Sequence, residues 1–295
     1  MSELSHALLG LIAQTPIHAG ASASEGIVDL PIQREAHTDW PCIYGSSMKG
    51  AIRAKAEPLE CFKGNKDIFF EIFGPDTGNA ADHASSMSVT DARLLFMPVR
   101  SLTTHFRYVT CPALLKRFKK DLARLGFSEL TEFSVPTVTA DRAICGDSQG
   151  ELYLEEFLFQ SDKGEVDDLI NALSVIFSDE VADEVKSTLT IISDDQFRHI
   201  VRAATPVQAR IAIENENKVV KGGALWYEES LPPETIMYTT LSAVSGRGKA
   251  KQSAEVIRNS ILDQVFDQPY LQVGGNETVG MGWFQVTPYI GKEGA

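Results

Sequence analysis

The sequence has few cysteines and no long apolar run. Its four cysteines are widely separated, with no C-x-x-C pair and no histidine at a zinc-site spacing, so we expect neither structural zinc nor a disulfide framework. The N-terminal residues lack the basic start and apolar core of a signal peptide. No stretch approaches the roughly 18 apolar residues of a membrane-spanning helix. We therefore expect a cytoplasmic protein without a membrane partner.

Basic residues are also scarce, with 27 lysines and arginines against 40 acids and a net charge of −13. This deficit argues at first against a nucleic-acid partner, because phosphate contacts need cations. The deficit is local, however, since residues 151–195 hold 13 acidic and 2 basic residues. Residues 93–124 carry eight basic residues and one acid. Such a segment either attracts a polyanion or is a solvated helix face, and composition does not decide between the two.

Apolar periodicity and the positions of glycine and proline predict an α+β fold without internal repeats. A single body with insertions is more economical than two domains. We expect a strand in LLGLIAQTPIHAG, a loop over about 20–40, a helix over 47–57, a strand with a bend at Pro98 over 87–102, a helix over 112–125 ended by Gly126, and helices over about 165–177 and 249–266.

Residues 206–229 alternate apolar and polar side chains on either side of a polar tip at 214–218. This pattern predicts a long β-hairpin. Because few of the alternating residues are large, we expect the hairpin to project from the body and to need a partner for full burial.

The stretch GSSMKGAIR, residues 45–53, has two interpretations. Ser46 or Ser47 can cap a helix whose first amides and dipole attract an anion. Lys49 and Arg53 share a helix face, where like charges repel unless something negative lies between them. No Gly-Lys-Ser/Thr follows, so this is not a Walker A loop. Taken alone, the nine residues favour an ordinary capped helix.

Three other features could belong to a functional site. Asp29 lies in a flexible loop, where a carboxylate can serve as a metal ligand or general base. His18 could act as a general acid or contact a phosphate. Clustered glycines let a backbone approach a ligand and offer amides to phosphates, and the cluster here is Gly274, Gly275, Gly280 and Gly282. Each feature has a structural alternative. Asp29 could simply form a turn, His18 could be a hydrogen-bonded structural histidine, and the glycines could form tight turns between strands.

Taken in order, GSSMKGAIR, FGP, SVTDARLLFMPVRSL, YVTCP, ARIAIE…GALWYEESLPPET and VGGNETVGMGW resemble the RAMP proteins of CRISPR systems. The resemblance is to the repeated backbone subunit of the Cmr, or type III-B, effector complex, and it extends from about His18 to Trp283. It implies one RRM-like, ferredoxin-type body over 1–295. Insertions would be a catalytic loop (18–41), a helical and acidic insertion (112–195) and a projecting thumb hairpin (206–229).

The same resemblance implies partners and residue roles. Copies of the subunit would stack into a helical filament on a guide RNA, beside other Cmr subunits, and the thumb would kink the duplex of guide and target RNA. Asp29 matches the aspartate required for cutting, and His18 matches a position near that site. Further RNA contacts are assigned to Ser46, Ser47, Lys49, Arg53, Arg210, Gly274, Gly275, Gly280 and Gly282.

The implied activity is metal-dependent endonucleolytic cleavage of complementary target RNA at regular intervals. The metal would be Mg²⁺ or Mn²⁺ with Asp29 as its ligand. One carboxylate holds such an ion weakly, so RNA phosphates and waters would complete its shell. Two alternatives stay open: a non-catalytic guide-RNA scaffold, and the equivalent backbone subunit of a Csm, or type III-A, complex.

Two features depart from RNA-binding relatives. The aromatic pairs with which a standard RRM stacks bases are not evident, so we expect recognition of the RNA backbone and shape, with base pairing supplying sequence specificity. Residues 151–195 make the chain acidic. We expect this segment to face away from RNA or to meet a basic partner subunit.

Overall fold

The computed structural model describes residues 4–22, 26–75, 83–147 and 150–291. Within these residues, one mixed sheet follows the order β13-β14-β1-β12-β4-β5-β9-β6-β8-β7, with β2 and β3 attached to it. Its strands are β1 (Leu4–Ala13), β2 (Cys42–Ile43), β3 (Met87–Val89), β4 (Ala92–Arg100), β5 (Phe106–Thr110), β6 (Arg142–Cys145), β7 (Gly150–Leu154), β8 (Phe157–Lys163), β9 (Thr190–Ile192), β12 (Ile236–Val244), β13 (Tyr270–Gln272) and β14 (Trp283–Tyr289).

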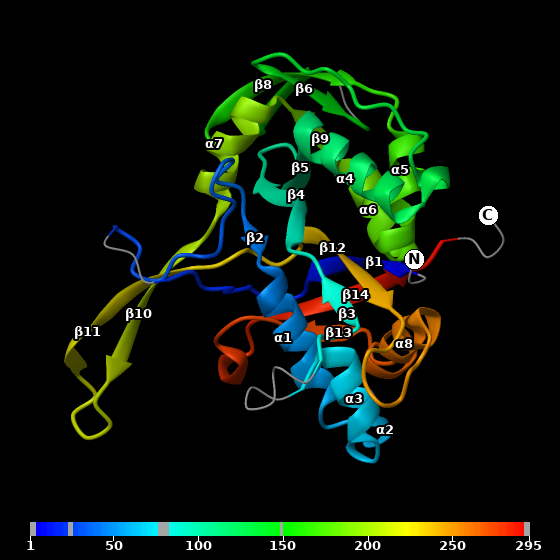
Figure 1. Ribbon diagram of the computed structural model, residues 1–295. Coiled ribbons are helices and arrows are strands. Elements are labelled where there is room, and N and C mark those ends of the chain that lie inside the picture. Colours follow the sequence, from blue (N-terminus) through cyan, green and yellow to red (C-terminus); the bar gives the residue numbers. More distant parts are fainter. Residues whose placement is uncertain (1–3, 23–25, 76–82, 148–149, 292–295) are drawn as a thin grey trace.

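The hairpin expected over 206–229 corresponds to a separate two-stranded sheet of β10 (Val207–Ile213) and β11 (Val220–Glu229), which projects from the body (Figure 1). The α-helices are α1 (Gly45–Ala56), α2 (Glu60–Lys63), α3 (Lys66–Phe73), α4 (Pro112–Leu125), α5 (Asp167–Leu173), α6 (Asp179–Thr188), α7 (Asp194–Ala204) and α8 (Ala254–Ser260). No helix of the described residues is long and apolar enough to cross a membrane.

Both faces of the central strands are buried. Successive side chains of β1 point to opposite faces, as they do in any strand. Leu9 and Leu11 join the core formed with α1 and α8. Leu8 and Ile12 join a second core, to which α4 and α5 contribute. The two groups of helices lie on opposite sides of β1, β12 and β14 (Figure 1).

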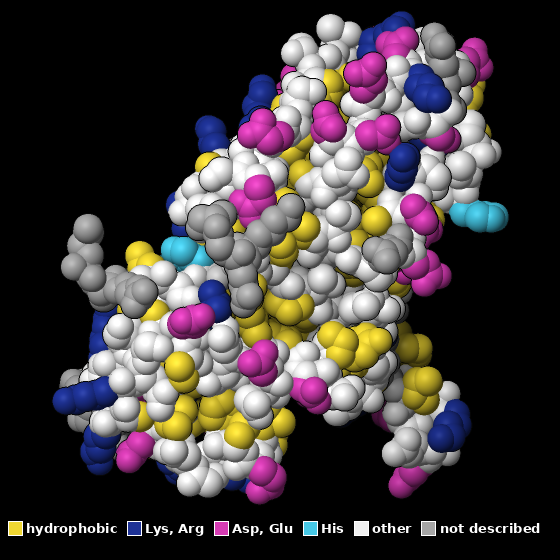
Figure 2. Space-filling view, turned by 90° about the vertical axis from the view of Figure 1, so that its right-hand side faces the viewer, with side chains coloured by type: hydrophobic (Ala, Val, Ile, Leu, Met, Phe, Trp, Pro, Cys, Tyr) yellow, Lys and Arg dark blue, Asp and Glu magenta, His cyan; other side chains and the backbone are white. Residues whose placement is uncertain are grey.

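The acidic segment does not lie wholly on the outside. The helix expected over 165–177 is α5 followed by a 3-10 turn at Ser174–Ile176. Its apolar residues are buried in the second core, among them Leu173 and Ile176. Its carboxylates, those of Glu165, Asp167 and Asp168, are exposed, and Figure 2 shows acidic side chains over the upper part of the molecule. The segment therefore covers one face of the sheet with its apolar side.

Three element boundaries differ from the sequence-based expectations. The strand around Pro98 is interrupted at Thr90–Asp91 rather than at the proline. Neither Ser46 nor Ser47 caps α1, whose N-cap is Tyr44, without a side-chain bond. The helix expected from residue 249 begins only at Ala254, where the Ser253 hydroxyl accepts the Val256 amide. Residues 245–253 form a loop because their backbone is bound to a buried carboxylate, Glu71.

The contact between β1 and the acidic segment generates a first prediction. A Cβ atom at Gly10 would lie 2.3 Å from the carbonyl oxygen of Ile176. Gly10→Ala should therefore lower the free energy of unfolding by about 1–3 kcal/mol, because the backbone must shift. Gly50→Ala, in α1 with open space around it, should instead stabilise by roughly 0.5–1 kcal/mol. Denaturant unfolding of both variants checks the contrast, and equal effects would contradict it.

Candidate nucleic-acid interface

The loop that contains Asp29 is hydrogen-bonded to the edge of β11, at the base of the hairpin. The Tyr227 amide donates to Asp29 Oδ2 at 2.7 Å. Next to this bond, the Leu30 amide donates to the Tyr227 carbonyl and the Glu229 amide donates to the Leu30 carbonyl, each at 3.0 Å. Asp29 itself is exposed. Segments about 200 residues apart in sequence thus present one carboxylate beside the hairpin base.

His18 is bound to the same edge of β11. Its Nδ1 lies 2.7 Å from the Glu229 carbonyl oxygen, and since a carbonyl can only accept, Nδ1 carries the hydrogen. The ring is buried, with 8% of the residue exposed. Tyr227 and Glu229 are two positions apart on β11, a separation of roughly 7 Å between Cα atoms. The two predicted catalytic residues are therefore anchored to neighbouring positions of one strand.

A buried ion pair fixes this arrangement. Glu229 Oε1 accepts from Arg34 Nη2 at 2.6 Å, and the two side chains are 10% and 17% exposed. The other carboxylate oxygen accepts the Ile32 amide at 2.9 Å. Arg34 also donates to the Asp39 carbonyl and to the Thr205 hydroxyl. The part of the loop that follows Asp29 is thereby held against the hairpin base.

Arg210 joins the hairpin to the glycine cluster. Its Nη2 lies 3.3 Å from Glu228 Oε1 and 3.2 Å from the sulfur of Met281. Glu228 accepts a second bond, at 2.6 Å, from Asn276. An arginine assigned to RNA is therefore also a structural residue, because it neutralises a carboxylate that is 5% exposed.

The glycine cluster forms tight turns against His18. Gly274, Gly280 and Gly282 have positive φ angles, which explains the need for glycine. The Gly275 amide donates to the His18 carbonyl, that of Gly280 to Glu277, and that of Gly282 to Pro16. Three of the four glycine amides are thus committed to protein carbonyls. Tight turns account for these glycines, and two of them, Gly274 and Gly275, pack closely on His18.

The cations of α1 contact backbone carbonyls. Lys49 Nζ lies 3.3 Å from the Met87 carbonyl oxygen, and Arg53 Nη1 lies 2.9 Å from that of Gly74. Burial, together with the charge of Arg53, lowers the pKa of Lys49. Ser46 is exposed and Ser47 is half-buried. At the start of α1, Asp91 Oδ1 accepts the Gly45 amide and Gln33 Oε1 accepts the Tyr44 amide, so distant side chains replace the expected serine cap.

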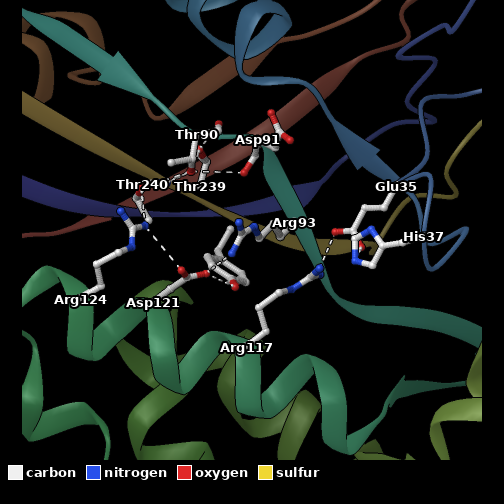
Figure 3. A network of polar contacts seen from close by, with 11 residues as sticks. Glu35, His37, Thr90, Asp91, Arg93, Arg117, Asp121, Arg124, Thr239 and Thr240 are labelled. Carbon is white, nitrogen blue, oxygen red and sulfur yellow. Dashed lines mark hydrogen bonds and ion pairs between the residues drawn. The ribbon is translucent and has the colours of Figure 1, made fainter.

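Much of the basic segment 93–124 is neutralised inside the protein. Asp121 of α4 lies between Arg93 and Arg124, with its carboxylate oxygens 2.6 and 3.5 Å from them (Figure 3). Arg117 bonds Glu35 of the Asp29 loop (Figure 3). Arg107, which is 1% exposed, pairs with Asp147 at 2.5 Å. The Arg124 pair lies within α4, whereas the other three join α4 or β5 to other parts of the chain. Neither interpretation from composition predicted this outcome.

The hairpin exposes apolar side chains along both of its strands. Seven apolar residues of the hairpin are each 41–56% exposed: Val207, Ile211, Ile213, Val219, Val220, Leu225 and Tyr227. Solvent-exposed apolar residues gathered on one projecting element are typical of a surface that meets a partner.

Asp29 alone does not fit a resident divalent ion. No group of three or more His, Cys, Asp or Glu side chains in the described part of the chain could hold a metal. A hard cation such as Mg²⁺ needs about six oxygen ligands, and Asp29 supplies one carboxylate. Its Oδ2 already accepts the Tyr227 amide.

Sequence reasoning missed the residues that hold this site together, namely Arg34, Glu228 and Glu229. The sequence offered one signal for the two acids. Glu228 and Glu229 are adjacent at the end of a predicted strand, far from the polar hairpin tip where solvated carboxylates are expected. Their partners in the Asp29 loop and the glycine cluster are distant in sequence, so the pairing itself required the structure.

The buried ion pair leads to a second prediction. Glu229→Ala should destabilise the protein by about 3–5 kcal/mol, because it leaves Arg34 and the Ile32 amide buried without their acceptor. Hydrogen exchange at Ile32 should accelerate with it. Glu60→Ala removes an exposed pair with Lys63 and should change the melting temperature little. A Glu229 variant as stable as the parent would show that the pair does not fix the loop.

Known proteins share this architecture along almost the whole chain. Residues 11–285 match the RAMP superfamily. The CRISPR system Cmr endoribonuclease Cmr4 of Pyrococcus furiosus is 39% identical over 286 residues, covering 95% of this chain and 94% of the relative. The crystal structure of oligomeric Cmr4 from that organism has a TM-score of 0.75 at 32% identity and covers 99% of this chain and 100% of that one. A chain of the type III-B Cmr-beta complex in its apo state has a TM-score of 0.73 at 26% identity, with 96% of both chains covered.

Proposed function

Because the chain belongs to the RAMP superfamily, we propose that it is the repeated backbone subunit of a type III-B CRISPR effector complex. In this role it binds guide RNA, stacks with further copies and other Cmr subunits, and cleaves complementary target RNA. One observation carries the proposal: the exposed Asp29 carboxylate is fixed to β11 at the base of a projecting hairpin.

Cleavage requires an activated nucleophile, in-line geometry and stabilisation of developing charge. Asp29 is the group proposed to act on the RNA, either as general base or as a ligand. The Tyr227 amide orients one carboxylate oxygen, and no hydrogen bond among the described residues occupies Oδ1. His18 donates its Nδ1 hydrogen to the Glu229 carbonyl. Its assigned role is to support the site from its buried position next to the glycine turns.

The RRM-like body is supported by strand order and chain order. The strands β14, β1, β12 and β4 are adjacent and antiparallel. The chain passes through β1, α1, β4, β12, α8 and β14, which is the β-α-β-β-α-β order of the ferredoxin-like motif. We assign the remainder as insertions: the catalytic loop (18–41), the helical and acidic insertion (112–195) and the thumb (206–229).

The exposed apolar hairpin suits the role of the thumb. A splayed nucleotide beside a kinked duplex would present its phosphate for in-line attack, and an apolar hairpin can separate stacked bases at a cost of a few kcal/mol per step. The hairpin base adjoins Asp29 through the Tyr227 and Leu30 bonds. A kink made by the hairpin would therefore lie beside the carboxylate.

Metal dependence is part of the proposal, with the ion arriving on RNA. The carboxylate of Asp29 would be one ligand, and RNA phosphates would have to supply others. Such an ion, Mg²⁺ or Mn²⁺, would stabilise charge on the reacting phosphate. The residues of this chain would only orient it.

The catalytic role of Asp29 can be separated from its structural role. Asp29→Asn keeps an oxygen that can accept the Tyr227 amide, whereas Asp29→Ala removes both the charge and this bond. Both variants should assemble and bind guide RNA but lose target cleavage by about 10²-fold or more, because the reacting group is absent. Cleavage assays on reconstituted complexes measure this. Cleavage at the parental rate would instead favour the non-catalytic scaffold.

The assignment of α1 to the guide backbone has its own test. Replacing both Lys49 and Arg53 by alanine should lower the slope of log K for guide RNA against log salt by about 1.4, since each phosphate contact on a single strand contributes about 0.7. Lys163→Ala with Lys186→Ala, two cations in the acidic segment, is the matched control. If the α1 variant keeps the parental slope and only has a lower melting temperature, Lys49 and Arg53 have a structural role, as donors to backbone carbonyls, and do not contact RNA.

A further inference from the structure

Residues 246–252, GRGKAKQ, form a closed loop between β12 and α8, which we call the cationic loop. The Gly246 amide donates to the Gln252 carbonyl at 2.7 Å, so the two ends of the loop meet. Arg247, Lys249 and Lys251 are exposed, whereas the residues between them are half-buried. Three positive side chains thus project from seven residues.

A fully buried carboxylate holds this loop in place. Glu71 of α3 is 0% exposed, and its two oxygens accept the amides of Lys251 and Gln252 at 2.9 and 2.8 Å. A Cβ atom at Gly246 would lie 1.9 Å from Glu71 Oε1, so only glycine fits there. The Arg247 amide also donates to Ser86 at 3.3 Å. The backbone of the loop is therefore fixed by buried acceptors, while its cationic side chains face solvent.

The charges of the loop are largely unneutralised. Lys249 approaches Asp67 at 3.9 Å, and both side chains are more than half exposed. For the side chains of Arg247 and Lys251, the described residues provide no ion-pair partner. Three like charges held on one ordered loop repel one another, and a polyanion removes that repulsion. Because the loop backbone is already ordered, binding has to order only the side chains.

The location of the loop connects it to α1. Its anchors are Glu71, near the end of α3, and Ser86, just before β3. Arg53 contacts the Gly74 carbonyl at the end of α3, and Lys49 contacts the Met87 carbonyl at the start of β3. Cations from α1 and from the loop therefore border the same junction between α3 and β3.

We propose that the cationic loop is a second phosphate-binding site for single-stranded RNA, at the opposite end of β12 from Asp29. This inference rests on the proposed function, because it extends the RNA contact already assigned to α1. The chain runs from the Asp29 anchor on β11 through residues 230–235 into the Ile236 end of β12, and the loop follows Val244 at the other end. The eight residue steps of β12 from Ile236 to Val244 span roughly 27 Å, so an RNA strand that contacts both sites extends over several nucleotides.

The test combines Arg247→Ala, Lys249→Ala and Lys251→Asn in the full chain. Asparagine is chosen because Lys251 has a φ of 53°, which asparagine tolerates. The probe is a fluorescein-labelled oligouridine of roughly 30 nucleotides, titrated by anisotropy at several salt concentrations. The slope of log K against log salt should fall by about 2, since three contacts of about 0.7 each are lost.

The control removes Lys163 and Lys186 and should leave the slope at the parental value. If the parent itself shows no salt-dependent binding, the proposed function fails. If the parent binds and the loop variant keeps the same slope, only the cationic-loop inference is overturned. Sedimentation of the same variant identifies the alternative: a loss of self-association with an unchanged slope would assign the loop to the acidic surface of a second copy, and would also overturn the inference.

Discussion

Burial of the central sheet on both faces limits where this protein can bind anything. Leu9 and Leu11 are covered by α1 and α8, while Leu8 and Ile12 are covered by the helices that follow residue 112. An RRM uses an open sheet face to stack bases, and here that surface is occupied by the protein's own core. Ligands are therefore left with strand edges, loops and the projecting hairpin. The candidate site at the edge of β11 follows from this constraint.

The same constraint explains the use of charge. The acidic segment supplies the second layer of helices, with apolar residues on the sheet and carboxylates in water. The cations of residues 93–124 largely pair inward, with Asp121 and Glu35 among their partners. Net charge is consequently a poor guide to RNA binding in this chain. The cations that matter for the proposed function are the few held outward or against backbone carbonyls.

Sequence patterns predicted the elements that are determined by interactions between residues close together in the chain. The helix over 112–125 with its terminal Gly126 is confirmed, since its apolar period and its left-handed C-cap are local properties. The expected serine cap of α1 was wrong, because Asp91 and Gln33 supply the acceptors from elsewhere. The helix start at residue 249 was wrong because Glu71, 180 residues away from Lys251, binds those amides. Asp29 could be nominated from its loop, but its bond to Tyr227 could not.

The pairing of β1 also has a consequence for how the chain is made. Both neighbours of this N-terminal strand, β12 and β14, begin more than 220 residues later. During synthesis, the apolar residues of β1 remain without these partners until β14 has left the ribosome, so the sheet cannot close earlier. Long-range pairing of this kind folds slowly and exposes unpaired edges in the meantime. Nascent chains should therefore depend on chaperones until nearly the whole sequence has been translated.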